Sequence, residues 1–131
     1  MTQEEILDYN KRCAEFLGWK ETSEQFKMDW VGCKSKERLG RLDKQYIPIL
    51  EKNGDVIFPG FEVIDFVNDW NWIMKVVEAI EKLQSTQVDI LGKYCRISNK
   101  GIDFQCSSKE DKKEAVVKAI NQFLIWYNKN I

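Results

Sequence analysis

Apolar residues recur at steps of three and four residues near the start of the chain, which is the spacing of an α-helix that buries one face. Within residues 2–17 the apolar stripe comprises Ile6, Tyr9, Cys13, Phe16 and Leu17. Thr2 and Glu5 have the spacing of a capping box, and Gly18 follows as a left-handed C-terminal cap. The pattern predicts a first helix over residues 2–17.

Two later segments show the same periodicity over wider apolar faces. One runs from residue 69 to about residue 83 and follows Asn68, a good N-cap. The other begins after Ser107 or Ser108 and includes Tyr127, and Ser107 with Glu110 fits a capping box. Apolar arcs this wide predict two helices that each contact more than one neighbouring element.

On each of these two segments, a Trp and an Ala share one flank. The pairs are Trp72 with Ala79 and Trp126 with Ala119. Two helices on one sheet face meet along flanks of the same hand when they run antiparallel, and two intervening strands would produce that direction. We therefore expect the helices to lie side by side and antiparallel, with each Trp over the neighbour's Ala.

Between the first and second helices, alternating apolar and polar residues are typical of short strands. Residues 26–31 alternate, while residues 46–50 and 56–58 flank Asn53-Gly54, the strongest hairpin signal in the chain. Residues 32–45 hold two glycines and a basic cluster, which predicts a mobile loop.

After the second helix, the apolar positions change parity. Val88 and Ile90 have even numbers, whereas Cys95 and Ile97 have odd numbers. One extra residue would bring both sets onto one face, so we expect a single long strand with a bulge or bend at Gly92-Lys93.

The partner of this strand is expected at residues 102–106. Its apolar residues share a face with Cys95 and Ile97 only if the loop around Lys100-Gly101 has two or four residues. This register sets Cys95 opposite Cys106. We expect the two sulfur atoms to lie close together without a disulfide bond in a reducing environment.

The order of these elements is α-β-β-β-α-β-β-α. It predicts an α+β fold with a mainly antiparallel sheet packed by three helices, in a layered α/β sandwich. We expect a single domain over residues 1–131, in which residues 20–60 form irregular strands and a basic loop.

Composition narrows the chemistry that the chain can perform. Of the 131 residues 44% are hydrophobic, and the net charge of −1 gives no broad attraction to nucleic acid or acidic lipid. The absence of histidine excludes a Ser-His-Asp or Cys-His arrangement within the chain. The four cysteines form no C-x-x-C pair, so buried structural thiols are expected. We expect no cofactor, no metal and no enzymatic activity.

Targeting signals are not evident in the sequence. The N-terminus has no basic start followed by an apolar run, and no window approaches the roughly 18 apolar residues of a membrane span. We therefore expect a cytoplasmic protein without a membrane partner.

Three motifs carry a resemblance to a known group of proteins. They are Phe16-Leu17-Gly18-Trp19, Asp69-Trp70-Asn71-Trp72-Ile73-Met74, and Glu114-Ala115-Val116 with the later Trp126-Tyr127. In these motifs the chain resembles small uncharacterised phage and prophage proteins with a phage-type α/β/α (ABA) sandwich domain. The resemblance covers the first helix and most of the second half. It implies a mobile-element origin and a layered fold, and it implies no catalytic residue.

Tryptophans and basic side chains form the candidate interaction surface. Its members are Trp30, Lys34, Lys36, Arg38, Arg41, Trp72 and Trp126. Exposed Trp is enriched at protein interfaces, and Trp beside Lys or Arg can also stack on single-stranded bases. For Trp72 and Trp126, the competing interpretation is a helix–helix seam inside one subunit.

Three hypotheses follow from the sequence. The first is a non-enzymatic interaction protein of phage or prophage origin. Its partner is a protein, and self-association with a second copy of the chain is one form of this hypothesis. The alternative is an accessory protein that binds single-stranded DNA or RNA through the basic 27–44 segment. A carboxylate and metal enzyme ranks below both, because Asp65 and Asp69 are better explained as acids at a strand end and a helix start.

Overall fold

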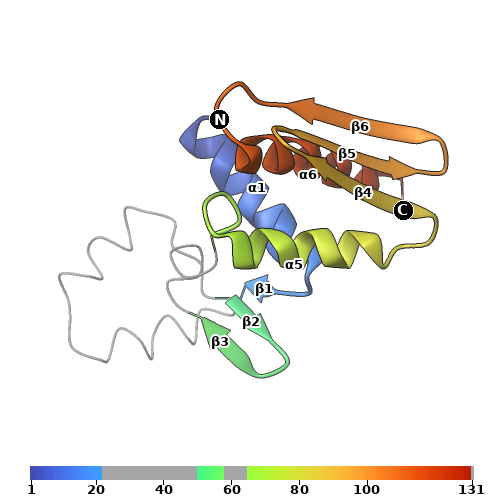
Figure 1. Cartoon of the computed structure of the whole chain (residues 1–131). Coiled ribbons are helices and arrows are strands. Elements are labelled where there is room, and N and C mark those ends of the chain that lie inside the picture. Colours follow the sequence, from blue (N-terminus) through green and yellow to red (C-terminus); the bar gives the residue numbers. More distant parts are fainter. Residues whose placement is uncertain (22–49, 58–64, 131) are drawn as a thin grey trace. The chain divides into compact units, whose positions relative to one another are not determined.

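A computed structural model gives the structure of the chain (Figure 1). It describes residues 1–21, 50–57 and 65–130. The chain divides into two compact units, Met1–Leu17 with Asp65–Ile131 and Gly18–Ile64. The single domain over residues 1–131 stays a prediction.

The smaller unit contains a three-stranded antiparallel sheet of β1 (Lys20–Glu21), β2 (Leu50–Lys52) and β3 (Asp55–Ile57). Asn53 and Gly54 take the positive φ angles of 52° and 89° that a tight two-residue turn requires. The predicted hairpin is therefore confirmed, and within the described residues its strands lie closer to the turn than expected. The strand predicted at 26–31 and the loop predicted at 32–45 lie outside the described residues.

The larger unit begins with helix α1 (Gln3–Phe16). The Thr2 hydroxyl accepts a hydrogen bond from the Glu5 backbone N–H at 3.1 Å, so the predicted cap is confirmed. Gly18 follows the helix with a φ of 94°, as expected for a residue in the left-handed region.

The sheet of the larger unit has three antiparallel strands in the order β4 (Thr86–Leu91), β5 (Tyr94–Asn99) and β6 (Ile102–Ser107). The single bent strand expected across Gly92-Lys93 is wrong, because the chain reverses there in a two-residue turn that pairs Leu91 with Tyr94. Gly92 supports this reversal with a φ of 56°. Antiparallel partners across such a turn have opposite parity, and this explains the change that the sequence showed.

The second hairpin confirms the predicted register. Lys100 and Gly101, at φ angles of 48° and 87°, form a two-residue turn, and Cys95 pairs directly with Cys106. Cys13, Cys95 and Cys106 are all free thiols. The closeness of the sulfur atoms of Cys95 and Cys106 stays a prediction.

Two further helices, α5 (Trp70–Glu81) and α6 (Lys112–Lys129), complete the unit. Their starts differ from the prediction. Asp69 caps α5 by accepting a hydrogen bond from the Asn71 backbone at 2.9 Å, and Asp111 caps α6. Asn68 instead belongs to the turn before α5, and Ser108 accepts hydrogen bonds from the backbone of the turn before α6.

Both helices lie on one face of the sheet, with α5 against β4 and α6 against β5 and β6 (Figure 1). They are side by side, as expected, but the antiparallel direction is wrong. Lys113 at the start of α6 donates a hydrogen bond to the Asn68 carbonyl before α5 at 3.1 Å, so both helices begin at the same end. The reason is that three strands, not two, separate them.

The α1 helix joins this layer through buried contacts to distant parts of the chain. Arg12 donates a hydrogen bond to Asn121 of α6 at 2.9 Å. Both backbone groups of Phe66 are held by α1, because Asn10 Oδ1 accepts from its N–H at 3.2 Å and the Tyr9 hydroxyl donates to its carbonyl at 3.1 Å. Tyr9, Asn10 and Phe66 are all buried.

Side chains from α1, α5, α6 and the inner sheet face form one core. Its largest fully buried members in this unit are Tyr9, Phe66, Phe123, Ile73, Ile80, Ile97, Ile120, Leu124, Val76 and Val77. The described part of the chain therefore has the predicted class, an α+β fold in layers with an antiparallel sheet packed by helices.

Candidate functional site

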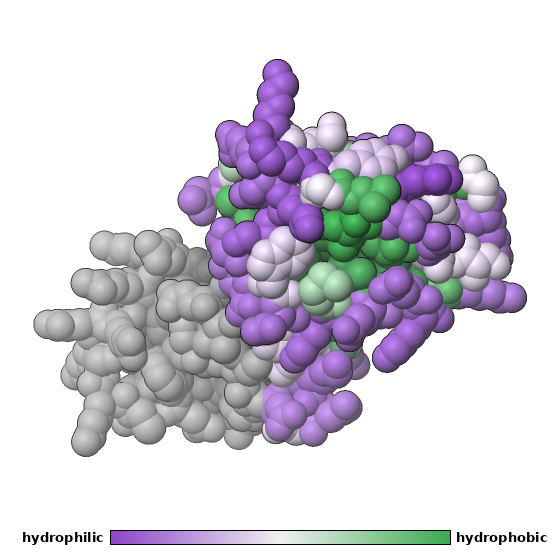
Figure 2. Space-filling view, viewed as in Figure 1, coloured by the Kyte–Doolittle hydropathy of each residue, from purple (hydrophilic) through white to green (hydrophobic). Residues whose placement is uncertain are grey.

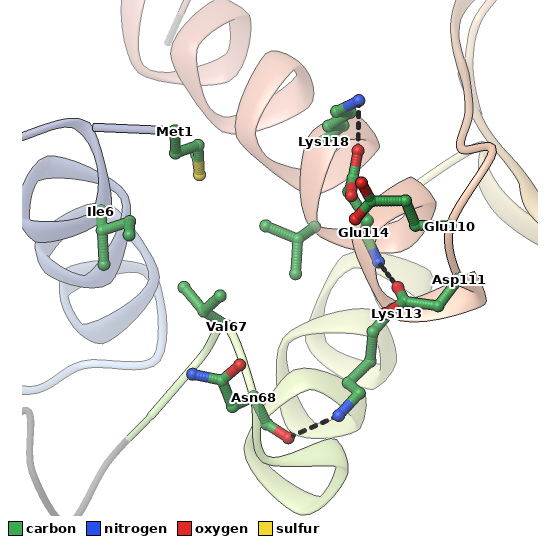
Figure 3. Close-up of a pocket in the computed structure, with 10 residues that line it drawn as sticks. Met1, Ile6, Val67, Asn68, Glu110, Asp111, Lys113, Glu114 and Lys118 are labelled. Atoms are coloured by element: carbon green, nitrogen blue, oxygen red, sulfur yellow. Dashed lines mark hydrogen bonds and ion pairs between the residues drawn. The ribbon is translucent and has the colours of Figure 1, made fainter. Parts of the chain in front are cut away.

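A hollow of about 500 Å³ lies where the three helices of the larger unit begin (Figure 3). Apolar side chains line one part of it: Met1, Ile6, Val67 and Val117. Polar residues from the start of α6 and the turn before α5 line the rest: Asn68, Glu110, Asp111, Lys113, Glu114 and Lys118. The parallel direction of α5 and α6 brings these residues to one end of the unit.

Two charged groups of this hollow form an ion pair with each other. Glu114 Oε1 and Lys118 Nζ are 2.6 Å apart, and this bond holds the pKa of Glu114 below and that of Lys118 above its usual value. Asp111 Oδ1 accepts a hydrogen bond from the Glu114 backbone at 2.7 Å. Two of the carboxylates therefore already have structural partners, and the pKa of Glu114 is lowered, whereas a general acid at neutral pH needs a raised pKa.

The acids before α5 also have structural roles. The Asp65 carboxylate accepts hydrogen bonds from the Val67 and Asn68 backbones at 2.9 and 3.0 Å, and Asp69 caps the helix. Asp69 lies at the helix start as expected, whereas the strand that Asp65 was expected to end lies outside the described residues. Within the described residues, no group of three or more His, Cys, Asp or Glu could hold a metal ion.

Trp126 belongs to an aromatic cluster rather than to a free surface. Its ring lies 5.7 Å from Phe104 of β6 and 5.9 Å from Phe123 of α6, measured between ring centroids. Phe123 also stacks on Tyr127 at 5.7 Å. Half-buried Trp126 still lines a smaller hollow of about 250 Å³ with Tyr127, at the end where α5 and α6 finish. The expected contact of Trp126 with Ala79 of the neighbouring helix stays a prediction.

Trp72 lies in the first turn of α5, at the opposite end of the helices from Trp126. It is half-buried, meets Phe66 edge-on at 5.9 Å and has Lys75 Nζ 4.1 Å from its ring centroid. Such a cation–π contact uses one face of the indole. The two tryptophans therefore lie at opposite ends of the helices, and their part in an interaction surface stays a prediction.

The other candidate residues lie outside the described residues. They are Trp30, Lys34, Lys36, Arg38 and Arg41. The hypothesis of binding single-stranded nucleic acid through residues 27–44 therefore stays a prediction.

The described thiols are poor nucleophiles. Burial raises the pKa of Cys13 and that of Cys95 to about 12, and burial also raises the pKa of Cys106. A thiol with a pKa this high is protonated at neutral pH, and the thiolate is the reactive form. These cysteines have the properties of core residues.

The outer face of the sheet is polar and open. Here Arg96 Nη2 and Asp103 Oδ2 form an ion pair at 3.0 Å, and Gln87 donates to Asp89 at 2.9 Å. Hydrogen bonding from Ser98 and then the charge of Arg96 hold the pKa of Asp103 below its usual value. This face has the character of a solvated sheet surface.

One edge of the sheet is different, because apolar side chains gather along β4. Val88 and Ile90 are half-buried, and Leu91 is 69% exposed. In Figure 2 the largest apolar patch on the face shown lies over α5 and β4, within a hydrophilic surrounding. Among the described strands, β4 pairs only with β5, and we call its other edge, with Val88, Ile90 and Leu91, the β4 edge.

Sequence reasoning missed the β4 edge because the bent-strand interpretation did not make β4 an edge strand of its own. The signal was present, since a parity change around a glycine is also the pattern of a two-residue hairpin. The hollow at the helix starts was missed for a related reason, because antiparallel helices would have placed their starts at opposite ends.

Comparisons with known proteins, by family model, by sequence and by solved structure, give no match. The resemblance to the phage-type α/β/α sandwich proteins, and with it the phage or prophage origin, stays a prediction. Among the described helices, none combines the length and apolar character needed to cross a membrane. The cytoplasmic location also stays a prediction.

Proposed function

We propose that the protein is a non-enzymatic interaction protein that binds a protein partner by adding a strand at the β4 edge. The observation that carries this proposal is the combination of a sheet edge with apolar side chains on and beside it. An unpaired edge offers backbone donors and acceptors to an incoming strand, and adjacent apolar residues add area that binding removes from water.

The chemistry of the described residues supports the proposal. The Glu114 carboxylate pairs with Lys118, and the Asp111 carboxylate caps α6. The buried thiols remain protonated at neutral pH. These groups stabilise the fold in their present positions. Leu91, by contrast, has 69% of its surface exposed and no evident structural role there.

A photo-reactive amino acid at position 91 tests this proposal in cells that produce the protein. Position 105 is the matched control, because Gln105 is exposed and lies on the other edge strand, β6, with its side chain on the same outer face of the sheet. We expect one protein to cross-link from position 91 and not from position 105. Equal cross-linking from both positions, or none from position 91, contradicts the proposal.

The captured protein is then purified and titrated calorimetrically against two variants of the full chain, Leu91→Lys and Gln105→Lys. Both side chains are exposed, so neither change disturbs the core. We expect Leu91→Lys to weaken binding by about tenfold or more, because the change removes exposed apolar surface that binding would take out of water. Gln105→Lys, with the same charge change, should bind like the unmodified chain.

A further inference from the structure

The register of the sheet defines which backbone groups the β4 edge offers. Leu91 and Tyr94 close a two-residue turn, so residues 87, 89 and 91 direct their N–H and C=O groups toward β5. Thr86, Val88 and Ile90 alternate with them and direct theirs away from the sheet. An incoming strand would therefore bond to these three residues.

The opposite edge of the sheet also carries a charge. β6 carries Asp103, and the charge of Lys118 on α6 acts on the β6 thiol of Cys106. Charges along an edge oppose the approach of another strand. β4 has the sequence Thr-Gln-Val-Asp-Ile-Leu, with one charged residue, Asp89, and neither Lys nor Pro. The two edges differ instead in their exposed apolar residues, because Leu91 of β4 is 69% exposed and Ile102 of β6 is 42% exposed.

We infer that β4 pairs antiparallel with β4 of a second copy of this chain, about a two-fold axis at Val88. This inference rests on the proposed function and names the partner. The two sheets then form one continuous sheet of six strands. Because α5 packs against β4, the axis also brings α5 of each copy under the junction, where the half-buried apolar residues lose their remaining contact with water.

The edge is self-complementary in this register, which is the reason for choosing a second copy. Val88 lies opposite Val88 of the second copy, and Thr86 lies opposite Ile90. On the outer face, Gln87 lies opposite Asp89 of the second copy, so an amide donor faces a carboxylate acceptor. Shifting the axis to residue 89 would instead place two Asp89 carboxylates directly opposite each other, which is unfavourable.

This register makes a charge test available on the solvent side of the sheet. Gln87 is exposed, so its replacement leaves the core intact. In Gln87→Lys the new ammonium faces Asp89 of the second copy, whereas in Gln87→Glu two carboxylates face each other. Each contact occurs twice per dimer, so we expect the dimer Kd to fall about threefold to tenfold with Lys and to rise by a similar factor with Glu.

The measurement is sedimentation equilibrium of the full-length chain over the micromolar range, with circular dichroism to confirm folding. Gln105→Lys and Gln105→Glu make the same change in net charge on the other edge strand, and we expect both to leave the dimer Kd unchanged. Adding salt should reduce the difference in dimer Kd between Gln87→Lys and Gln87→Glu, because salt screens the charges. A dimer that responds to Gln105 and not to Gln87 overturns the inference.

A strict monomer at all concentrations also overturns the inference, and the cross-linking experiment then decides about the proposed function. If a different protein cross-links from position 91 to the monomer, the β4 edge is an interaction surface for another partner. If neither a dimer nor such a partner is found, the inference and the proposed function fail together.

Discussion

The contact between α1 and the segment before α5 leads to a quantitative prediction for Tyr9→Phe. Tyr9 and Phe66 both have 0% of their surface exposed, and the Tyr9 hydroxyl donates to the Phe66 carbonyl at 3.1 Å. The change keeps the aromatic ring and removes only the donor, so it leaves a buried carbonyl without this partner. The expected loss in the free energy of unfolding is about 1–2 kcal/mol.

Urea denaturation followed by circular dichroism measures this loss, and a thermal scan should show a midpoint lower by about 3–8 °C. The matched control is Tyr94→Phe. Tyr94 is half-buried on the open face of the sheet, where water can solvate its hydroxyl, so its change should stay within about 0.5 kcal/mol. Equal effects of the two variants would refute the role assigned to the Tyr9 hydroxyl.

A double-mutant cycle extends the test to the second bond on the same residue. Asn10 Oδ1 accepts from the Phe66 N–H at 3.2 Å, and Asn10 is 6% exposed. Asn10→Ala alone should cost about 2 kcal/mol, because it leaves a buried donor unpaired. Once either bond is lost the Phe66 segment can move, so we expect the double variant to lose less than the sum of the single losses. Strict additivity would show that the two bonds act independently.

Three further predictions concern pH, a helix cap and a turn. Burial raises the pKa of Cys13 from 9.0 to about 12, so the contribution of the protonated thiol to stability is complete below pH 9. This contribution is lost as the pH rises toward 12, by at most about 1.4 kcal/mol per pH unit. In Cys13→Ala the urea midpoint should therefore fall less steeply with alkaline pH, and an unchanged slope would contradict this assignment. Asp111→Ala removes the N-cap of α6 and should lower the free energy of unfolding by about 1 kcal/mol. The control Lys109→Ala, at an exposed position before the helix, should lower it by less than about 0.5 kcal/mol in the same urea assay. Gly92 has a φ of 56°, so Gly92→Ala should cost about 1–2 kcal/mol, and a loss no larger than that of Lys93→Ala would argue against the turn.

Local chemistry explains which parts of the fold could be predicted from the sequence. The Thr2 cap and the Asn53-Gly54 turn each depend on a few neighbouring residues, and both are present in the structure. The pairing of Cys95 with Cys106 was also accessible, because the two-residue turn and the shared apolar face leave little freedom in register.

The candidate site was less accessible to sequence reasoning. Two of its residues, Trp72 and Trp126, are described, and each is half-buried against other aromatic rings at opposite ends of the helices. An aromatic residue on a helix flank can pack on a sheet or face solvent with the same sequence pattern. The surroundings supplied by β6 and by Phe66 decide between these outcomes.

The sequence by itself determined where the helices and the hairpins at Asn53-Gly54 and Lys100-Gly101 form, because capping, turn conformation and periodicity act over a few bonds. Tertiary structure alone decided that the chain reverses at Gly92, that α5 and α6 run in the same direction, and that β4 lies at an edge. The physical reason is that parity records which face a side chain occupies and not the direction of the chain, so a bend and a hairpin give the same pattern. Contacts between distant residues, such as Tyr9 with Phe66 and Lys113 with Asn68, select one arrangement.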